Sequence, residues 1–323
     1  MLVAVLLFAV GLVLLIKGGD WFVDGATGIA RKFHVPELLI GATVVSIGTT
    51  LPEVMVSTTS ALSGHGEISY GNAIGSVICN TALIAAISVA AKPSKIDKKT
   101  LRIPVFFFFA AAIYYAVIAY FTGRFSRVAG INMLLIFAVY IGVQVYFALK
   151  ASKNGAQSEE HENETENKLG KDIILLVIGA ALIAVGANLL VDNGIIIANG
   201  LGVPESVIAL TFVALGTSLP EFVTAITSLK KGHGLLSLGN VIGANLFNIV
   251  LVSGVSVALA PFDVPNSKQV MGYNSSLLID IPVMFGVMLI LTVPPMISGK
   301  LKRWQGILLL ALYAAFCIFQ FAV

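Results

Sequence analysis

Charged residues are scarce in this sequence of 323 residues, in which Asp, Glu, Lys and Arg together make up only 11%. Soluble domains carry about 25% charged residues, so this composition does not suit a surface that faces water. The hydrophobic content is 57% and the mean hydropathy is +0.94. The composition therefore predicts an integral membrane protein that is embedded in the lipid bilayer.

Other features are missing as well, and each excludes a class of protein. The two cysteines, Cys79 and Cys317, lie in apolar segments without metal-ligand spacing, so we expect neither a disulfide framework nor a zinc site. A net charge of +3 is too small to indicate binding to nucleic acid. The apolar segments contain no His-Glu-x-x-His motif and no Ser/His arrangement, so we predict neither an enzyme nor a cofactor.

Ten apolar runs are long enough to cross a bilayer. They cover approximately residues 2–22, 38–62, 70–91, 102–122, 127–149, 172–193, 206–229, 238–260, 275–296 and 303–321. No basic residue precedes the first run and no small-residue cleavage site follows it, so we expect a retained helix. A hydrophilic stretch at residues 150–171 separates five runs from five and is predicted to be a flexible linker.

Basic residues are distributed unevenly between the two predicted faces. Sixteen of the 20 Lys and Arg residues lie in the loops that follow odd-numbered runs, and only three lie in the other loops. Cytoplasmic loops of membrane proteins are enriched in Lys and Arg. We therefore expect a multi-pass protein of the cell membrane, with a cytoplasmic linker and with both termini extracellular.

An internal repeat relates the two halves of the chain. A shift of 168 residues aligns residues 7–83 with 175–251 without a gap, and 31 of these 77 positions are identical. Each half has an odd number of spans, so the second copy crosses the membrane in the opposite direction. The predicted fold is an all-α membrane protein with ten transmembrane helices in two inverted five-helix repeats, residues 1–149 and 172–323. Many secondary transporters have this build, with their site near the midplane.

Each repeat carries the same acidic motif in the middle of a predicted span. Residues 48–53 read Gly-Thr-Thr-Leu-Pro-Glu, and residues 216–221 read Gly-Thr-Ser-Leu-Pro-Glu. Proline has no N–H for the carbonyl four residues earlier, so each helix is expected to open locally at Gly48 and Gly216 and expose oxygens. An ionisable residue at the bilayer centre costs about 2.5 to 3.5 kcal/mol on insertion scales, so a function must offset the burial of Glu53 and Glu221.

No basic residue lies at the depth of the two glutamates, because Lys17 is closer to a span end and is expected to extend to the interface. The predicted partner of the glutamates is therefore a bound cation. Carboxylates, hydroxyls and carbonyls are hard oxygen ligands, which suit Ca²⁺, Na⁺ or Mg²⁺ and do not suit zinc or copper. A protonated, hydrogen-bonded structural pair is the alternative.

A polar stripe follows in the next span of each repeat. Residues 71–80 read Gly-Asn-Ala-Ile-Gly-Ser-Val-Ile-Cys-Asn, and residues 239–248 read Gly-Asn-Val-Ile-Gly-Ala-Asn-Leu-Phe-Asn. Glycines four residues apart in both segments predict a close helix–helix approach, at Gly71 and Gly75 and at Gly239 and Gly243.

The polar residues of this stripe are also four apart, so each set shares one helical face. The sets are Asn72, Ser76 and Asn80 in the first repeat and Asn240, Ala244 and Asn248 in the second. Asn80 and Asn248 either flank an ion or join helices. Asn72 and Asn240, near the predicted span starts, either cap a helix or contact an ion.

These paired motifs resemble the two alpha repeats of the cation/calcium exchanger superfamily, specifically its prokaryotic sodium/calcium exchanger branch. The resemblance covers essentially the whole chain, and the alpha repeats correspond to residues 41–81 and 209–249. It implies that Glu53 and Glu221 bind Ca²⁺ together with the backbone carbonyls of Thr49 and Thr217. It also implies Na⁺ sites that share the glutamates, with Asn80 and Asn248 flanking the centre. The other implied Na⁺ positions are Ser46, Thr50, Ser76, Ala214 and Ser218.

Two positions differ from the pattern of several prokaryotic relatives. Ala244 stands where they have serine, which removes a hydroxyl from one implied Na⁺ site. Asn248 stands where they have aspartate, which leaves only two carboxylates at the centre. Asparagine at this position also resembles the potassium-independent branch, so we do not expect K⁺ cotransport.

The predicted function is secondary active antiport of Na⁺ and Ca²⁺ by alternating access. One Ca²⁺ neutralises both glutamates, whereas an empty cavity would carry two desolvated charges, which opposes crossing without a load. The family expectation of three Na⁺ for one Ca²⁺ would make Ca²⁺ extrusion electrogenic. A Ca²⁺/H⁺ antiporter and a cation channel remain as alternatives. The linker is too short for a Ca²⁺-sensing domain, and we expect the protein to function as a monomer.

Overall fold

The chain forms an almost entirely helical protein in the computed structural model, which describes residues 2–156, 169–200, 216–266 and 269–322. Within these ranges, nine helical segments are long and apolar enough to cross a membrane. The predicted all-α membrane fold is confirmed. The remaining predicted span, 206–229, lies partly outside the described residues, and its second half forms α11 (Leu219–Lys230).

The helices of the two repeats follow the same order along the chain. The first repeat contains α1 (Leu2–Lys32), α2 (Glu37–Ile40), α3 (Ser46–Leu62), α4 (Gly66–Cys79), α5 (Ala86–Ala91), α6 (Lys98–Thr122) and α7 (Arg127–Ala156). The second contains α8 (Leu169–Gly200), α11, α12 (Gly234–Phe247), α13 (Ser253–Leu259), α14 (Ile281–Ser298) and α15 (Arg303–Ala322). π-helical turns join several pieces into longer rods: η1 (Gly41–Val45), η2 (Asn80–Ala85), η4 (Asn248–Val252) and η5 (Ser276–Asp280).

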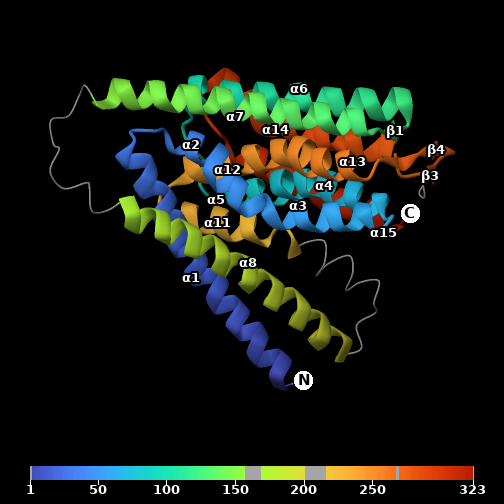
Figure 1. Ribbon diagram of the computed structural model, residues 1–323, viewed down its shortest axis with the longest axis horizontal. Coiled ribbons are helices and arrows are strands. Elements are labelled where there is room, and N and C mark those ends of the chain that lie inside the picture. The colour runs from blue at the N-terminus through green and yellow to red at the C-terminus, as the bar shows by residue number, and fades with distance from the viewer. Residues whose placement is uncertain (1, 157–168, 201–215, 267–268, 323) are drawn as a thin grey trace.

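Helices α1 and α8 show the inversion of the repeats directly. They are equivalent under the 168-residue shift, and they lie side by side in opposite directions (Figure 1). Their backbones approach closely at paired glycines. A Cβ on Gly11 would lie 2.9 Å from the Gly186 carbonyl oxygen, and a Cβ on Gly18 would lie 2.9 Å from the carbonyl oxygen of Gly179. Gly11 is equivalent to Gly179 and Gly18 to Gly186, so this contact has approximate two-fold symmetry.

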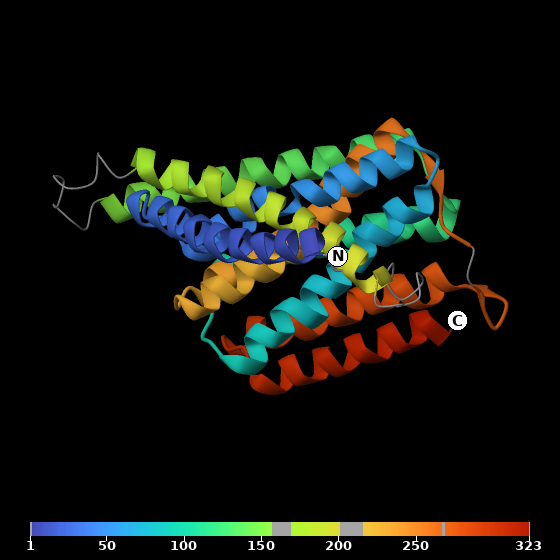
Figure 2. The same cartoon turned by 90° about the horizontal axis from the view of Figure 1, so that it is seen from below.

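The other helices form a bundle, and the α1–α8 pair crosses one side of it at a slant (Figures 1 and 2). α12 lies at the centre of the bundle, where every residue from Leu236 to Phe247 is buried. The hydrophobic core has two parts: a large one within the bundle and a smaller one that joins α1 and α8 to η1 and to the N-terminal part of α12. The slanted pair is therefore packed on the bundle through its own small core.

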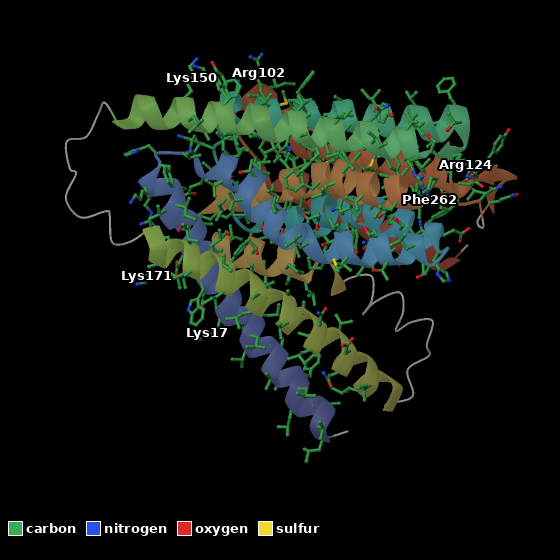
Figure 3. All side chains as sticks on the ribbon, viewed as in Figure 1. Lys17, Arg102, Arg124, Lys150, Lys171 and Phe262 are labelled. Carbon is green, nitrogen blue, oxygen red and sulfur yellow. The ribbon has the colours of Figure 1, made fainter. Side chains whose placement is uncertain are left out.

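Short backbone pairings tie the two repeats together at both ends of the bundle. At one end, β1 (Arg124–Phe125) pairs antiparallel with β2 (Phe262–Asp263), beside a hairpin of β3 (Gln269–Val270) and β4 (Tyr273–Asn274). At the other end, where α7 and α8 meet the linker, Lys95 and Lys300 form an isolated bridge. Figure 3 shows Arg124 and Phe262 at the first end and Lys150 and Lys171 toward the second.

α1 is longer than predicted, because it continues past the end of its apolar run to Lys32. The extension carries Asp24, whose carboxylate lies 2.8 Å from the Nζ of Lys231 in the turn between α11 and α12. The same Nζ donates to the backbone carbonyl of Asp20 at 2.9 Å. In this turn, His233 Nδ1 also lies 2.7 Å from Glu37 Oε1. The Lys231 contacts compensate the acidic residues in the last turns of α1, and the His233 contact does the same for α2. Hydropathy alone could not reveal these contacts.

The close approach predicted from the glycine pairs is confirmed for α12. A Cβ on Gly239 would lie 2.2 Å from the Leu38 carbonyl oxygen, and a Cβ on Gly243 would lie 2.3 Å from Ser46 Oγ. For Gly71 and Gly75, the segment equivalent to residues 38–46 is 206–214, which lies outside the described residues. Close approach at these two glycines stays a prediction.

We expect Gly243→Ala to destabilise the protein, because its methyl group would force the Ser46 side chain and α12 apart. Overpacking of this kind costs about 1 to 3 kcal/mol. The control is Gly142→Ala on α7, where an added Cβ meets no described atom within 4 Å and where alanine is the better helix former. Thermal unfolding in detergent should show a lower melting temperature for the Gly243 variant only. Equal melting temperatures would contradict the close contact.

Candidate ion-binding site

The two motif glutamates meet at the interface of the repeats. Glu53 lies on α3 and Glu221 lies in the first turn of α11, and both side chains are 0% exposed. The Thr50 hydroxyl lies 3.5 Å from Glu221 Oε1, so the first motif touches the glutamate of the second. Folding thus brings together two motifs that are 168 residues apart in the sequence.

The polar atoms around this pair are buried and short of partners. Among the described residues, both carboxylate oxygens of Glu53, Oε2 of Glu221 and the hydroxyl of Ser218 have no hydrogen-bond partner. Buried polar atoms in proteins are nearly always paired, and leaving one unpaired costs free energy. A concentration of unpaired oxygens at one place is the donor set expected of a cation site.

No protein cation neutralises the glutamates in the part of the chain that the structure describes. The ion pairs there join Arg124 to Asp263, Lys231 to Asp20 and Asp24, and His233 to Glu37. All of these basic residues lie outside the site. The oxygens of Glu53 and Glu221 therefore remain available to a bound cation.

The two motifs differ in backbone shape. In the second repeat, Thr217 and Ser218 form a turn before α11, and Pro220 stands in the first turn of that helix, so the predicted opening is confirmed. In the first repeat, α3 continues through Pro52 without a break, so the predicted opening at Gly48 is wrong. The irregular turn lies earlier, at η1, where α12 presses against the backbone. α3 packs against α4, α12 and α13, and proline is tolerated in membrane helices where neighbouring helices satisfy the freed backbone groups.

Each motif threonine is held by an asparagine of the opposite repeat. The Thr49 hydroxyl donates to Asn240 Oδ1 at 3.2 Å, and the Thr217 hydroxyl donates to Asn72 Oδ1 at 3.1 Å. The two bonds are equivalent under the 168-residue shift. They fix the orientation of both threonine side chains and occupy their hydroxyl protons.

The alternative that Asn72 and Asn240 cap helices is wrong. Their helices begin at Gly66 and Gly234, with His65 and His233 at the N-cap positions, so both asparagines lie well inside. The predicted span began at residue 70 because Gly66–Ser69 is only weakly apolar. Asn72 Nδ2 also donates to Ser57 Oγ at 2.8 Å, whereas Asn240 Nδ2 has no partner among the described residues.

Asn80 and Asn248 open π-helical turns at equivalent positions of the two repeats. Asn80 is the first residue of η2 and Asn248 is the first residue of η4, and both are fully buried. Neither side-chain amide has a hydrogen-bond partner within the described ranges, so nothing there supports the alternative that they join helices. Isolated π-helical turns are rare and occur frequently at functional sites.

Comparison with known proteins places the chain in a family. A family model described as sodium/calcium exchanger protein matches residues 3–146 and again residues 171–322. The chain belongs to the sodium/calcium exchanger family. The two matched segments correspond to the two halves of this exchanger, as expected of a duplicated protein.

Individual relatives agree with this assignment over nearly the whole exchanger. It is 32% identical to the sodium/calcium exchanger MaX1 of Methanosarcina acetivorans, over 98% of both chains. It is 35% identical to the inner membrane protein YrbG of Escherichia coli, over 87% of both chains. A structure of the sodium-calcium exchanger NCX_Mj, soaked with 2.5 mM Na⁺ and 10 mM Sr²⁺, matches with a TM-score of 0.82, 34% identity and 97% coverage of each chain. The predicted family is confirmed, and its members are transporters rather than enzymes.

The structure places four of the five positions implied as additional Na⁺ ligands. Thr50 lies beside Glu221, and Ser218 is buried with an unpaired hydroxyl. The Ser46 hydroxyl lies 2.7 Å from the Gly41 carbonyl and 2.9 Å from the Asn240 carbonyl, which share its one proton as acceptors. Ser76 is buried on α4, one turn before Asn80, and Ala214 lies outside the described residues. Their roles as ion ligands stay predictions.

Two further polar residues of the exchanger were missed by the sequence analysis. Thr224 and Ser228 are fully buried on α11, and their hydroxyls have no hydrogen-bond partner among the described residues. They follow Glu221 at positions i+3 and i+7 and so share its helical face, which leads from the glutamate toward the linker end. The sequence shows this spacing, but threonine and serine are common in membrane helices, so the spacing alone does not indicate a site.

We expect Glu53→Gln and Glu221→Gln each to abolish stabilisation of the exchanger by Ca²⁺. A ligand at 100 times its Kd stabilises a protein by about 2.7 kcal/mol, so the unmodified protein should melt at a higher temperature in Ca²⁺. Each variant lacks one of the two negative charges that we expect to hold the ion. The control is Glu67→Gln, an exposed position on α4. If the glutamine variants were stabilised as strongly as the control, these carboxylates would not bind Ca²⁺.

Proposed function

We propose that this protein is a secondary antiporter that exchanges Na⁺ for Ca²⁺ by alternating access. The observation that carries the proposal is the pair of fully buried carboxylates at the interface of two inverted repeats, with unpaired oxygens and without a protein cation in the described residues. In inverted-repeat transporters, such an interface is where the transported ion binds.

Charge balance explains why the protein would exchange ions rather than leak them. Two carboxylates in a low-dielectric interior strongly disfavour an empty site, because each unpaired charge has lost its hydration. One Ca²⁺ or two Na⁺ ions balance the two negative charges. The protein therefore changes access from one side of the membrane to the other only when ions occupy the site, which couples the two fluxes. Three Na⁺ for one Ca²⁺ would move net charge and make Ca²⁺ extrusion electrogenic.

We assign the Ca²⁺ ligands to Glu53 and Glu221 with the backbone carbonyls of Thr49 and Thr217. The hydrogen bonds from Thr49 to Asn240 and from Thr217 to Asn72 support this assignment, because each positions a threonine by a residue of the opposite repeat. Na⁺ would share the glutamates and use hydroxyls at Ser46, Thr50, Ser76 and Ser218, with a backbone contribution at Ala214. Asn80 and Asn248 would flank the central position, since their side-chain amides have no hydrogen-bond partner among the described residues.

The ion pairs at the linker end fit a state that is closed at that end. Lys231 binds Asp20 and Asp24 of α1 and so ties the α11–α12 turn to the slanted pair. The positions equivalent to Lys231 and Asp20 are Ser63 and Asn188, so the opposite end cannot form the same ion pair. We infer that alternating access breaks the Lys231 contacts when the site opens toward the linker.

The names of the relatives, and the ions with which one of them was soaked, support Na⁺ as the counter-ion. MaX1 is named a sodium/calcium exchanger, and NCX_Mj was soaked with Na⁺ together with Sr²⁺ or Ca²⁺. YrbG is named an inner membrane protein, which supports a location in the cell membrane. The concentration of Lys and Arg in the loops at the linker end supports a cytoplasmic linker and extracellular termini. We propose that one chain suffices for transport, because the site is built from the two repeats of a single chain.

The decisive test is isotopic Ca²⁺ uptake into proteoliposomes, with Na⁺ and proton gradients imposed separately. We expect an outward Na⁺ gradient to drive Ca²⁺ uptake, a pH gradient alone to have no effect, and an imposed membrane potential to change the rate. Uptake that responds to pH and ignores Na⁺ would establish a Ca²⁺/H⁺ antiporter instead. Currents that need no ion on the far side would establish a channel.

We expect Ala244→Ser to lower the Na⁺ concentration needed for half-maximal exchange several-fold. Ala244 is 0% exposed on α12 and is equivalent to Ser76, so serine would supply the hydroxyl that the second repeat lacks. The matched variant Ser76→Ala should shift the Na⁺ dependence in the opposite direction. The measurement is Na⁺-dependent Ca²⁺ efflux, with Ca²⁺ affinity as the internal control. An unchanged Na⁺ dependence in both variants would exclude these positions from Na⁺ binding.

A further inference from the structure

A groove of about 660 Å³ lies at the linker end of the bundle, between the first turns of α6 and the last turns of α14. It belongs neither to the ion site nor to the interface of α1 and α8. The polar part of its lining is mainly basic, with Lys98, Lys99 and Arg102 beside Asp97, and the other part is apolar, with Ile96, Val293, Met296 and Ile297. Ile297 is 73% exposed, so the apolar part is open on the outer surface of the bundle.

The groove lies within a strongly basic patch formed by two loops, one from each repeat. The basic residues of this patch are Lys92, Lys95, Lys98, Lys99, Arg102, Lys300, Lys302 and Arg303. The loops are held together by their backbones: Ile96 donates to the Gly299 carbonyl and Leu301 to the Ser94 carbonyl, each at 2.9 Å. The bridge places Lys95 opposite Lys300, and like charges in that arrangement repel.

The patch contains little negative charge of its own. Asp97 is the only acidic residue in segments 92–103 and 299–303. Its carboxylate accepts hydrogen bonds from the Thr100 hydroxyl and the Lys99 backbone N–H, which lower its pKa. It therefore serves mainly as the N-cap of α6. None of the ion pairs in the described chain involves a basic residue of this patch.

Two of the basic side chains are bound to backbone, and two are left at the groove. Lys98 Nζ donates to the Ile297 carbonyl at 2.5 Å, and Arg303 Nε donates to the Ala90 carbonyl at 2.9 Å. Lys99 and Arg102 are exposed beside the groove, three residues apart on one face of α6. Arg and Lys so placed are the usual ligands of phosphate groups.

The groove lies at the level where a membrane changes from polar to apolar. Trp304 follows the basic loop directly and is 48% exposed, and tryptophan is enriched at membrane–water interfaces. Val293 and Ile297 are four residues apart and so form an exposed apolar strip along α14, leading away from the charges. A ligand that fits has an anionic head and an apolar tail.

We propose that this groove binds an anionic phospholipid from the leaflet at the linker end, with the phosphate at Lys99 and Arg102 and an acyl chain along Val293 and Ile297. Basic pockets between transmembrane helices bind anionic headgroups in other membrane proteins. The lipid would also neutralise the repulsion between the two loops. Because these loops come from different repeats, bound lipid stabilises their contact. The proposal does not depend on which ions the protein transports.

The test uses the full chain, delipidated in a neutral detergent and free of Ca²⁺. Native mass spectrometry measures the binding of phosphatidylglycerol, and thermal unfolding measures its stabilising effect. We expect phosphatidylglycerol to bind and raise the melting temperature, and phosphatidylcholine or inorganic phosphate to do neither. Equal binding of phosphatidylcholine would overturn the role of charge. An equal effect of inorganic phosphate would show a free-anion site instead of a lipid site.

Variants separate the groove from the general charge of the protein. Lys99→Gln combined with Arg102→Gln should weaken phosphatidylglycerol binding about 30-fold, which corresponds to about 1 kcal/mol for each basic side chain. The control is Lys17→Gln combined with Lys171→Gln, which removes the same charge from exposed positions on α1 and α8, away from Arg102 (Figure 3). The control should bind like the unmodified protein. An equal loss in both pairs would overturn the proposal.

Ile297→Ser tests the apolar half of the groove independently. Because this side chain is 73% exposed, the change should not disturb folding. We expect weaker binding of phosphatidylglycerol with long acyl chains and unchanged, weak binding of soluble glycerol phosphate. If Ile297→Ser leaves the affinity for the long-chain lipid unchanged, the acyl chain does not lie along α14.

Discussion

Two carboxylates buried at the interface of the repeats in a lipid-embedded protein are the constraint on which the rest of this structure depends. Glu53 and Glu221 are fully buried, and no described protein cation pairs with either. Such an arrangement is stable only with a cation or protons between the carboxylates. The surrounding features serve that arrangement: the glycines of α12 let helices approach closely, and the asparagines of the opposite repeat orient the threonines.

The two repeats share one plan, but they differ in the details that matter for an ion. Asn72 is braced by Ser57, whereas Asn240 has Ala225 at the equivalent position. The first motif lies on a continuous helix and the second follows a turn at Thr217–Ser218. At the linker end, Lys231 forms ion pairs that have no equivalent in the other repeat. The two sides of the site therefore differ in chemistry. The ion pairs at the linker end of the protein also differ from the contacts possible at the opposite end.

Sequence reasoning succeeded where the signal was local or duplicated. Apolar runs located nine spans that the structure describes, and the repeated motif identified the residues that meet at the centre. It failed where packing between distant segments decides. The opening at Pro52 did not occur because α3 packs against other helices, and α1 runs on to Lys32 because Lys231 of the other repeat compensates its acidic turn. The segments involved are far apart in the sequence.

By itself, the sequence determined the membrane location, the duplication and the family, because composition, a 168-residue repeat and the paired motifs are properties of the chain alone. Only the tertiary structure decided which asparagine holds which threonine, where π-helical turns place Asn80 and Asn248, and which basic residues border an apolar groove. Each of these depends on contacts between residues distant in the sequence. Their geometry follows from how the two halves pack, which local propensity does not encode.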